Sequence, residues 1–295
     1  MPELPEVESV RQSLEPIVGA RVKRVRVRTR RVLVVPGDPV GGFSRSSSGA
    51  RPKPVRRGAL LDGSRIARLE RHGKQLAVLS DTGPALGIHL GMTGRVLIVA
   101  ADDRTPARAH DHVVWTLDDG RGVVFNDARR FGGVWAYADE AALRERWSAL
   151  GPDALTIDGP ALRARLARTT RAIKGALLDQ GVLAGVGNIY ADESLHAARI
   201  HPELRADRLR PDDAERLAAA LRAILGHAVQ AGGSTLADGT YTDADGQAGS
   251  YATRHAVYGR GGQACRVCGS VLRSGTLAQR TTVWCPRCQR APRRA

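Results

Sequence analysis

Two Cys-x-x-Cys pairs near the C-terminal end of the chain hold all four of its cysteines. Cys265 and Cys268 form the first pair, and Cys285 and Cys288 form the second, with 16 residues between the pairs. This spacing is typical of a structural zinc site, in which four thiolates surround one Zn²⁺ as a tetrahedron. A chain of 295 residues does not need disulfides for stability, so the pairs indicate metal ligands in a reducing compartment. We expect a β-hairpin between the pairs, with the basic side chain of Arg280 near its tip.

Basic residues outnumber acidic ones, with 45 Lys and Arg against 30 Asp and Glu and a formal net charge of +15. Such a balance predicts a polyanionic partner, which is either a nucleic acid or an anionic membrane surface. A genome of high GC content would also raise the arginine count. The sequence has no apolar run of 18 residues and no basic-then-apolar start, so we expect no membrane span and a cytoplasmic protein.

The character of the chain changes near Ala138. Apolar residues recur at helical spacing over residues 5–17, and valines alternate with basic residues over 21–35. Further short strands, separated by Gly and Asp turns, are expected at 65–70, 75–80, 85–90, 94–99, 112–117, 122–126 and 133–137. This pattern predicts an antiparallel β-sandwich.

Beyond Ala138 the pattern is helical. Helices are expected at 139–149, 160–168, 171–180, 188–199 and 211–231. A glycine-rich stretch at 232–250 then leads to the cysteine pairs. We therefore predict an α+β chain with three domains, 1–138, 139–250 and 251–295, and an irregular basic loop at 42–58.

The chain starts with Met1-Pro2-Glu3-Leu4-Pro5-Glu6. Removal of Met1 would leave Pro2 with a free secondary amine, a group that titrates at about pH 8 and is partly neutral at about pH 7. Such an amine attacks an aldehyde-level carbon to form an iminium ion, and Glu3 and Glu6 are candidate proton shuttles. The alternative is that Pro2 only favours the removal of Met1 and that Glu3 and Glu6 belong to a solvated acidic turn.

Residues 181–187 form a glycine-rich turn between two expected helices, with Asn188 at the N-cap of the second helix and Lys174 in the first. The backbone N–H groups of such a turn can bind a phosphate. The arrangement is that of a helix-two-turn-helix element, and an ordinary corner between helices is the alternative.

Two further turns carry residues suited to entering a base stack. The first is His89–Gly94 with Met92, and the second is Asn126–Gly132 with Arg129 and Phe131. Phe131 could insert between bases, Arg129 could hydrogen-bond an orphaned base, and Met92 could fill the space of an extruded nucleotide. The alternative is a buried Met and Phe beside solvated arginines.

Taken together, these motifs resemble the bacterial formamidopyrimidine-DNA glycosylase family over nearly the whole chain. The resemblance rests on Pro-Glu-Leu-Pro-Glu-Val-Glu, His-Leu-Gly-Met-Thr-Gly, His110-Asp-His112, Arg129-Arg-Phe-Gly, Leu-Asp-Gln, Gly-Val-Gly-Asn-Ile-Tyr-Ala, Val257-Tyr-Gly-Arg and the four cysteines. It implies a helix-flanked sandwich, a helix-two-turn-helix domain and a four-cysteine zinc finger, with DNA in the cleft. It also implies a bifunctional glycosylase and AP lyase of base excision repair. Such an enzyme flips out and removes oxidised purines, 8-oxoguanine and formamidopyrimidines, and cleaves by β,δ-elimination. The expected partner is double-stranded DNA with a damaged base, bound by a monomer at the bacterial nucleoid.

The resemblance also implies a role for each matched residue. Pro2 is the nucleophile, Glu3 the acid that assists sugar opening, and Glu6 a supporting carboxylate. Lys74 matches a lysine linked to β-elimination and phosphate binding, and Arg280 matches an arginine linked to the second elimination. The expected DNA contacts are His110, Arg129, Asn188 and, beside them, Lys174, with Met92, Arg129 and Phe131 as the void-filling triad.

Two other functions stay open at this point. An endonuclease-VIII-like enzyme would act on oxidised pyrimidines, and the Met92, Arg129 and Phe131 set argues against it. A non-catalytic zinc DNA-binding protein could use the same scaffold, and the intact Pro2 and Lys74 argue against that. Thr169 and Thr170 stand where many relatives carry a basic residue, and Arg168 or Arg171 could supply that phosphate contact instead. Ala237 replaces a basic residue seen in some relatives, which leaves the base preference open.

Overall fold

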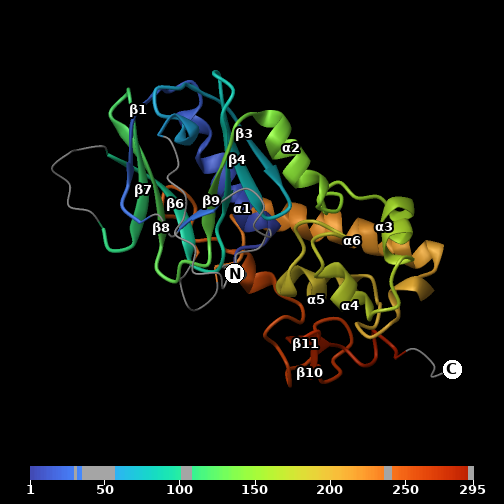
Figure 1. Cartoon of the computed structure of the whole chain (residues 1–295). Coiled ribbons are helices and arrows are strands. Elements are labelled where there is room, and N and C mark those ends of the chain that lie inside the picture. The colour runs from blue at the N-terminus through green and yellow to red at the C-terminus, as the bar shows by residue number, and fades with distance from the viewer. Residues whose placement is uncertain (30–31, 35–56, 101–107, 236–240, 292–295) are drawn as a thin grey trace. The chain divides into compact units, whose positions relative to one another are not determined.

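The computed structural model describes residues 1–29, 32–34, 57–100, 108–235 and 241–291. The chain divides into two compact units, residues 1–148 with 232–250, and residues 149–231 with 251–295 (Figure 1). The division into domains at 138 and 250 stays a prediction. Nearly all of the basic loop at 42–58, and Ala237, lie outside the described residues.

Two sheets form the first unit. One has the order β1-β7-β8-β6 and is antiparallel throughout, and the other has the order β2-β9-β5-β4-β3. The strand bounds are Val22–Val27 (β1), Leu33–Val34 (β2), Ile66–His72 (β3), Gln75–Ser80 (β4), Ala85–His89 (β5), Gly94–Ala100 (β6), Asp111–Leu117 (β7), Arg121–Asp127 (β8) and Gly133–Tyr137 (β9). The expected α+β class and sandwich are confirmed, except that the short β2 pairs with β9 in parallel.

Strand β1 shows how the valine pattern produces a half-buried strand. Val22 and Val25 are buried although three positions separate them, which strict alternation does not allow. The register shifts between Val22 and Arg24, where an extra residue enters the strand. Such a bulge moves the next side chain to the other face, so the valines reach the core while Lys23, Arg24 and Arg26 stay exposed.

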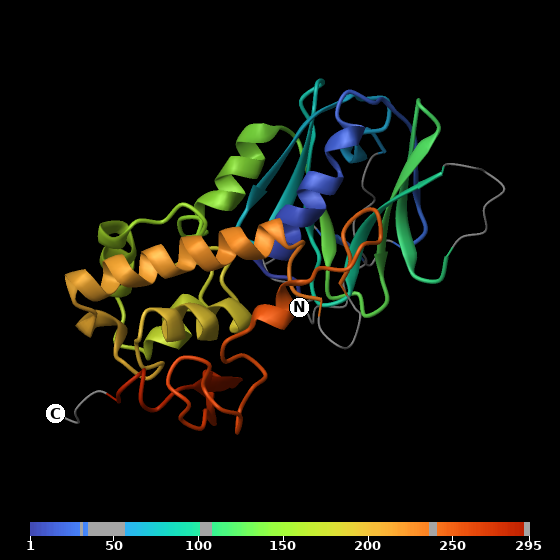
Figure 2. The ribbon, with the colours of Figure 1, turned by 180° about the vertical axis from the view of Figure 1, so that it is seen from behind.

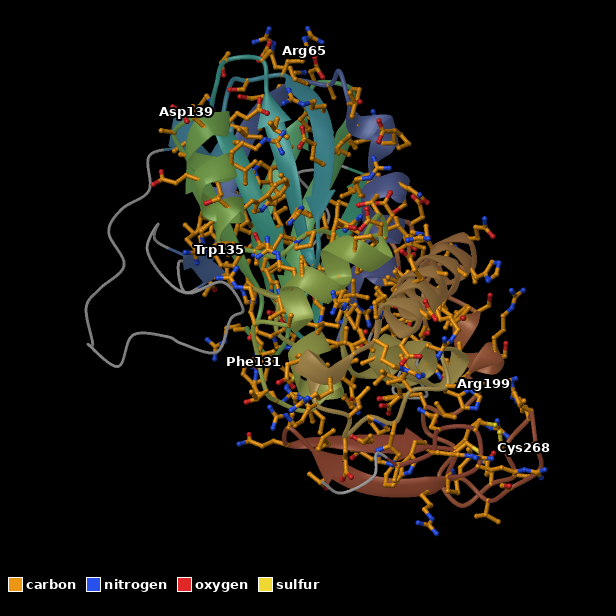
Figure 3. The ribbon with its side chains drawn as sticks, turned by 90° about the vertical axis from the view of Figure 1, so that its right-hand side faces the viewer. Arg65, Phe131, Trp135, Asp139, Arg199 and Cys268 are labelled. Atoms are coloured by element: carbon orange, nitrogen blue, oxygen red, sulfur yellow. The ribbon has the colours of Figure 1, made fainter. Side chains whose placement is uncertain are left out.

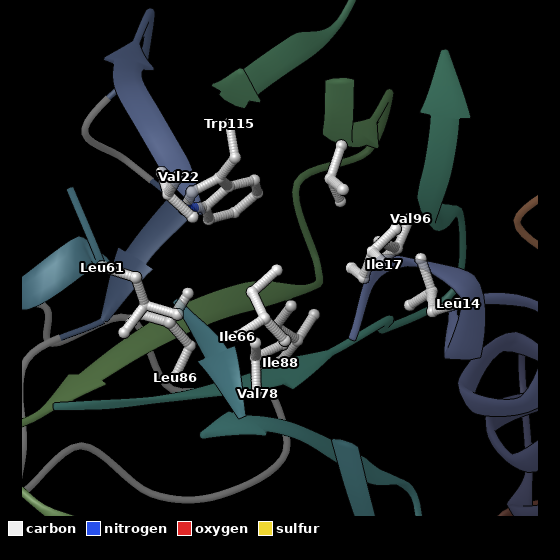
Figure 4. Close-up of a pocket in the computed structure, with 11 residues that line it drawn as sticks. Leu14, Ile17, Val22, Leu61, Ile66, Val78, Leu86, Ile88, Val96 and Trp115 are labelled. Atoms are coloured by element: carbon white, nitrogen blue, oxygen red, sulfur yellow. The ribbon is translucent and has the colours of Figure 1, made fainter. Parts of the chain in front are cut away.

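The core of this unit lies between its sheets and includes side chains from both. A cavity of about 20 Å³ remains in it, lined only by apolar side chains such as Leu86, Ile88 and Val96 (Figure 4). Trp115 also lines the cavity, and its indole N–H donates to the Leu60 carbonyl at 3.0 Å, so no polar atom is left for a water. The cavity is therefore a packing void and not a ligand site.

Helices α1 (Leu4–Ser13) and α2 (Glu140–Ser148) complete the first unit. Helix α1 packs against β3 and β4, and a 3₁₀ turn, Glu15–Ile17, follows it within the expected helix 5–17. Residues 241–250 return to this unit (Figure 2). There the Ala244 amide donates to Ser13 Oγ at 3.0 Å, and the Ala244 carbonyl accepts from Ile98 N at 3.0 Å.

The second unit is helical and ends in a hairpin. Its elements are α3 (Gly159–Leu166), α4 (Ile173–Leu177), α5 (Asn188–Ala197), α6 (Pro211–Gln230), β10 (Arg273–Leu277) and β11 (Arg280–Trp284). Helix α6 packs on α3 and α5, and α5 also contacts β11. As expected, α6 begins at Pro211 with two aspartates in its first turn, where the helix dipole favours negative charge. In the described part of the chain, no helix combines the length and apolar character of a membrane span.

Candidate functional site

Pro2 and Glu3 lie at the start of α1, and both are buried. Glu3 is the N-cap, and its backbone N–H donates to Glu6 Oε2 at 2.8 Å while its own carboxylate accepts from the Glu6 backbone. This reciprocal pair of bonds, a capping box, fixes the path of the chain just before the helix. The nitrogen of Pro2 is a peptide nitrogen while Met1 is attached, and removal of Met1 turns it into an amine.

The second oxygen of Glu6 binds a segment that the sequence suggested only as a linker. Glu6 Oε1 accepts from the Ser234 amide at 2.7 Å, and the Tyr241 hydroxyl donates to the Glu6 carbonyl at 3.0 Å. Gly233 has φ +83°, and a Cβ there would lie 2.8 Å from Glu6 Oε1, so only glycine fits. Burial raises the pKa of Tyr241, which keeps its hydroxyl a donor. In the sequence, only the Gly232-Gly233-Ser234 run hints that this segment makes a close backbone contact.

Lys74 follows Gly73 in the tight turn between β3 and β4 and is only 8% exposed. The neighbouring Arg71 attaches this turn to α1. Its Nε donates to Glu8 Oε2 at 2.8 Å, and its Nη1 donates to the Gly73 carbonyl at 3.0 Å. The turn of Lys74 and the helix that begins beside Pro2 are therefore linked by a nearly buried ion pair.

His89, at the end of β5, is neutral at physiological pH. Burial and, second, the positive charge of Lys74 lower the pKa of its imidazole to about 4, against a smaller effect of Asp127. Nδ1 of His89 accepts from the Gly91 amide at 3.0 Å. The histidine of the His-Leu-Gly-Met-Thr-Gly motif thus shapes the turn that carries Met92.

The structure brings the Met92 turn and the Arg129–Phe131 turn together. Met92 lies two residues before the start of β6 and the second turn follows β8, and these strands pair with Gly94 opposite Asp127. Arg129 is exposed, with its Cζ 4.6 Å from the centre of the half-buried Phe131 ring, which Figure 3 labels near the strand ends. This geometry is a cation–π contact.

His110 lies at the same sheet end, directly before β7. It is exposed with φ +70°, and its carbonyl accepts from the Asp127 amide at 3.1 Å. One end of the β7-β8-β6 sheet therefore carries His110, Arg129, Phe131 and Met92.

In the second unit, Lys174 is fully buried, which argues against the expected direct DNA contact. Its Nζ lies 2.8 Å from Asp192 Oδ1 and donates to the Thr281 carbonyl at 3.0 Å and to Thr282 Oγ1 at 2.8 Å. Asp192 Oδ2 accepts from the Val283 amide at 3.0 Å. A buried ion pair between α4 and α5 therefore anchors β11, directly beside Arg280.

The sequence predicts Asn188 as the N-cap of α5. In the structure Gly187 is the N-cap, and Asn188 is the first residue of the helix. The side-chain amide of Asn188 donates to the Thr281 carbonyl at 3.0 Å. In the turn before it, the amide of Gly185 donates to Gln180 Oε1 at 2.9 Å. The side chain of Gln180 therefore uses one of the turn amides that the sequence offered for a phosphate.

Arg280 is exposed and begins β11 after a tight turn. Ala278 and Gln279 both have positive φ, 49° and 58°, as in the turn types that match the twist of a two-residue hairpin. The expected hairpin with a basic tip is present in this form.

The four cysteine sulfurs all lie within 4.8 Å of one another, at the end of the hairpin opposite its turn. The amides of Val267 and Cys288 donate to Cys265 Sγ and Cys285 Sγ, each at 3.4 Å, an arrangement that suits thiolates. Around them, Val257, Leu272 and Val283 form a small apolar cluster. Four thiolates in this setting fit one structural zinc ion. Figure 3 labels Cys268 of this group.

Two buried side chains of α5, neither of them marked by a sequence motif, contact the finger segment. Glu193 accepts from three successive amides, of Ala256, Val257 and Tyr258, at 2.8 to 2.9 Å. His196 Nε2 lies 3.6 Å from Cys265 Sγ. The Val257-Tyr-Gly-Arg motif thus owes its position to a carboxylate on another element, which no local pattern reveals.

Models of three protein domains match the chain in order. They are the formamidopyrimidine-DNA glycosylase N-terminal domain over residues 1–134, the formamidopyrimidine-DNA glycosylase H2TH domain over 150–240, and a zinc finger found in FPG and IleRS over 262–291. The formamidopyrimidine-DNA glycosylase of Xanthomonas campestris pv. campestris is 39% identical over 293 residues, which cover 98% of this chain and all of that protein. That of Xanthomonas axonopodis pv. citri is 40% identical over 294 residues, with the same coverage.

Solved structures agree with these matches. The MutM (Fpg) protein of Thermus thermophilus has a TM-score of 0.80 and 37% identity, with 98% of each chain covered. Lactococcus lactis Fpg in complex with DNA containing an abasic site has a TM-score of 0.82 and 29% identity, with 98% of this chain and all of that chain covered. The chain therefore belongs to the formamidopyrimidine-DNA glycosylase family, the DNA glycosylases of base excision repair.

Proposed function

We propose that this chain removes oxidised purines, 8-oxoguanine and formamidopyrimidines, from double-stranded DNA and then cuts the strand on both sides of the lost nucleotide. The observation that carries the proposal is the buried start of α1, where the capping box of Glu3 and Glu6 holds Pro2 in place. A proline whose neighbours are fixed in this way presents its amine, after removal of Met1, with little freedom to lose on reaction.

The chemistry assigned to this start is Schiff-base formation. The Pro2 nitrogen bonds to C1′ as the bond from C1′ to the base breaks and the base leaves with a proton. Glu3 protonates O4′ as the sugar opens to an iminium ion. The iminium makes the C2′ proton acidic, so its loss expels the 3′ phosphate, and Lys74 supports this β-elimination. A water nucleophile would instead stop at an abasic site.

We assign the second elimination, which expels the 5′ phosphate, to the help of Arg280. An exposed guanidinium at a hairpin turn can hydrogen-bond a phosphate with two N–H groups and stabilise it as a leaving group. The four cysteines would hold zinc, which supplies no reactive position here and fixes the shape of the finger. The buried Lys174–Asp192 pair then positions the strand that follows Arg280.

The DNA partner is supported by the Lactococcus lactis relative, whose structures contain an abasic-site DNA and a Fapy-dG-containing DNA. We propose that Met92, Arg129 and Phe131 fill the helix after the damaged base has flipped out, with His110 and Asn188 contacting the backbone. The protein would act as a monomer on chromosomal DNA in the bacterial cytoplasm. Residues 1–138 would act as the catalytic domain, 139–250 as the helical domain and 251–295 as the finger.

Borohydride trapping on a panel of duplexes tests this proposal. Protein freed of Met1 should form a covalent adduct with 8-oxoguanine and abasic-site duplexes and little with undamaged DNA. The Pro2→Gly variant should bind the same duplexes and lose most of the adduct. A preference for thymine glycol would indicate the endonuclease-VIII-like activity, and no adduct with any duplex would indicate a non-catalytic DNA-binding protein.

A further inference from the structure

A buried carboxylate joins the two turns that carry Met92 and Arg129. Asp127, the last residue of β8, has no exposed surface. Its Oδ1 accepts from the Thr93 hydroxyl at 2.5 Å, and its Oδ2 accepts from the Gly132 amide at 2.8 Å. One carboxylate therefore binds the turn before β6 and the far end of the turn after β8.

The hydroxyl of Thr93 closes a second link between the same turns. Besides donating to Asp127, Thr93 Oγ1 accepts from the Arg129 amide at 3.1 Å. A hydroxyl can donate and accept at once, which a methyl group of the same size cannot do. Thr93 lies next to Met92, and Arg129 is itself a member of the triad, so this link joins two of the three side chains through their backbones.

The two turns also touch through main chain alone. A Cβ on Gly91, which has φ +63°, would lie 2.4 Å from the Gly132 nitrogen. A Cβ on Gly132 would lie 2.5 Å from the His89 carbonyl oxygen. These distances leave room only for glycine, so backbone packs directly against backbone without an intervening side chain.

We infer that Thr93 and Asp127 are positioning residues that fasten the two turns into a single rigid wedge. The inference rests on the proposed function, because it assigns Met92, Arg129 and Phe131 to the DNA helix. Side chains that enter a base stack lose conformational freedom, and turns that are already locked together lose less of it on binding. Neither residue needs to touch DNA for this effect.

The Thr93→Val variant tests the inference because valine keeps the shape and removes both hydrogen bonds of the hydroxyl. Two single-turnover rates are compared: base release from an 8-oxoguanine duplex, which needs the wedge, and cleavage of a preformed abasic site, which has no base to flip. Loss of two hydrogen bonds should slow base release by about tenfold. Abasic cleavage should stay within about twofold, and Thr93→Ser, which keeps the hydroxyl, should restore base release.

One companion variant controls for general damage, and a second tests the same link from its other side. Thr82→Val removes a turn hydroxyl that contacts Ser64 Oγ at 2.7 Å, in the turn at the other end of β5, and should change neither rate. Asp127→Asn replaces one of the two accepting oxygens by an NH2 group, so one of the two bonds is lost, and it should reproduce the selective loss of base release. A 2-aminopurine placed beside the lesion should report slower unstacking in Thr93→Val than in the wild type.

The possible outcomes separate the inference from the proposed function. Wild-type protein that cleaves neither duplex contradicts the proposed function and this inference with it. If the wild type cleaves both duplexes and Thr93→Val matches it, or loses both rates equally, the inference alone is wrong.

Discussion

The imidazole of His89 shows how one buried residue connects pH to the wedge. Its lowered pKa, about 4 against 6.5, means that protonation is resisted in the folded chain. The contribution of neutral His89 to the free energy of unfolding is fully present above pH 6.5. It is lost as the pH falls through about 4, by up to about 3 kcal/mol. The charged groups that act on it are Lys74, which lowers its pKa, and Asp127, which raises it.

We expect His89→Asn, whose amide oxygen can accept from Gly91, to lack this dependence. The free energy of unfolding in urea, measured at about pH 7, 5.5 and 4.5, should fall more steeply for the wild type than for the variant. Carboxylates that titrate in the same range affect both proteins alike. Parallel pH profiles would therefore contradict the assignment to His89.

Lys174 is the second residue whose role the structure defines. Burial raises the pKa of its partner Asp192 to about 6, and the charge of Lys174 acts against this rise. Lys174→Met would leave Asp192 buried without its partner, so we expect a loss of about 3 kcal/mol in the free energy of unfolding. The double variant with Asp192→Asn should lose less than the sum of the two single losses, as a double-mutant cycle by urea unfolding will show. Additive losses would mean that the two groups do not interact.

At the scale of elements, local pattern predicts most strands and helices and misses what distant partners decide. The strands near 75–80 and 133–137 match because alternating and apolar runs are local properties. The helix expected at 171–180 is only Ile173–Leu177, since Asp179 caps the following turn by accepting from the Gly181 amide at 2.9 Å. The contact of Ser234 with Glu6 spans 228 residues, and no local pattern could reveal it.

The candidate site divides in the same way. Pro2, Arg129 and the cysteines belong to short motifs, which are recognisable in the sequence alone. Thr93, Asp127 and Asp192 act by joining segments, so their importance depends on pairing and burial that only the fold creates. The expected DNA contact of Lys174 rests on the family resemblance, and its burial against Asp192, which only the fold reveals, argues against a direct contact.

The zinc finger is the element whose removal is easiest to test. Cys285→Ala removes one of four thiolates, and metal binding contributes much of the folding free energy of such a small domain. We expect the variant to lose its zinc on dialysis against a chelator and to bind lesion DNA at least about tenfold more weakly. Val267→Ala, which changes an exposed side chain between Cys265 and Cys268, should behave as the wild type. Unchanged DNA affinity in the zinc-free variant would show that the finger is dispensable.

Helix α5 should also control how firmly the finger holds its metal. A histidine that hydrogen-bonds a ligand orients it, and loss of such a partner typically costs about tenfold or more in metal affinity. His196→Phe should therefore release zinc to a chromogenic chelator about tenfold faster than the wild type. The matched control is His201→Phe. His201 is also a buried histidine, but it contacts the Trp284 ring and does not belong to the cysteine group. Equal release rates in all three proteins would exclude a role for His196.

The whole molecule has a net charge of +15, and its DNA partner is rich in phosphates, so its affinity for DNA should depend strongly on salt concentration. Each phosphate that the protein neutralises releases counterions, and a protein with several such contacts loses about 100-fold or more in affinity between roughly 50 and 200 mM salt. Fluorescence anisotropy with an abasic-site analogue duplex would give the slope of log affinity against log salt. Arg280→Gln should reduce that slope by about one, because one phosphate contact is lost.

Arg68→Gln is the control for Arg280→Gln, because both variants lose one positive charge. Arg68 already pairs with Glu70 at 2.8 Å and with Glu140 at 2.6 Å, so its loss removes one positive charge without removing a phosphate contact. If net charge alone governed binding, the two variants would change the slope equally. A change of slope in Arg280→Gln alone would show that DNA affinity depends on the position of this charge on the hairpin and not only on the net charge of the protein.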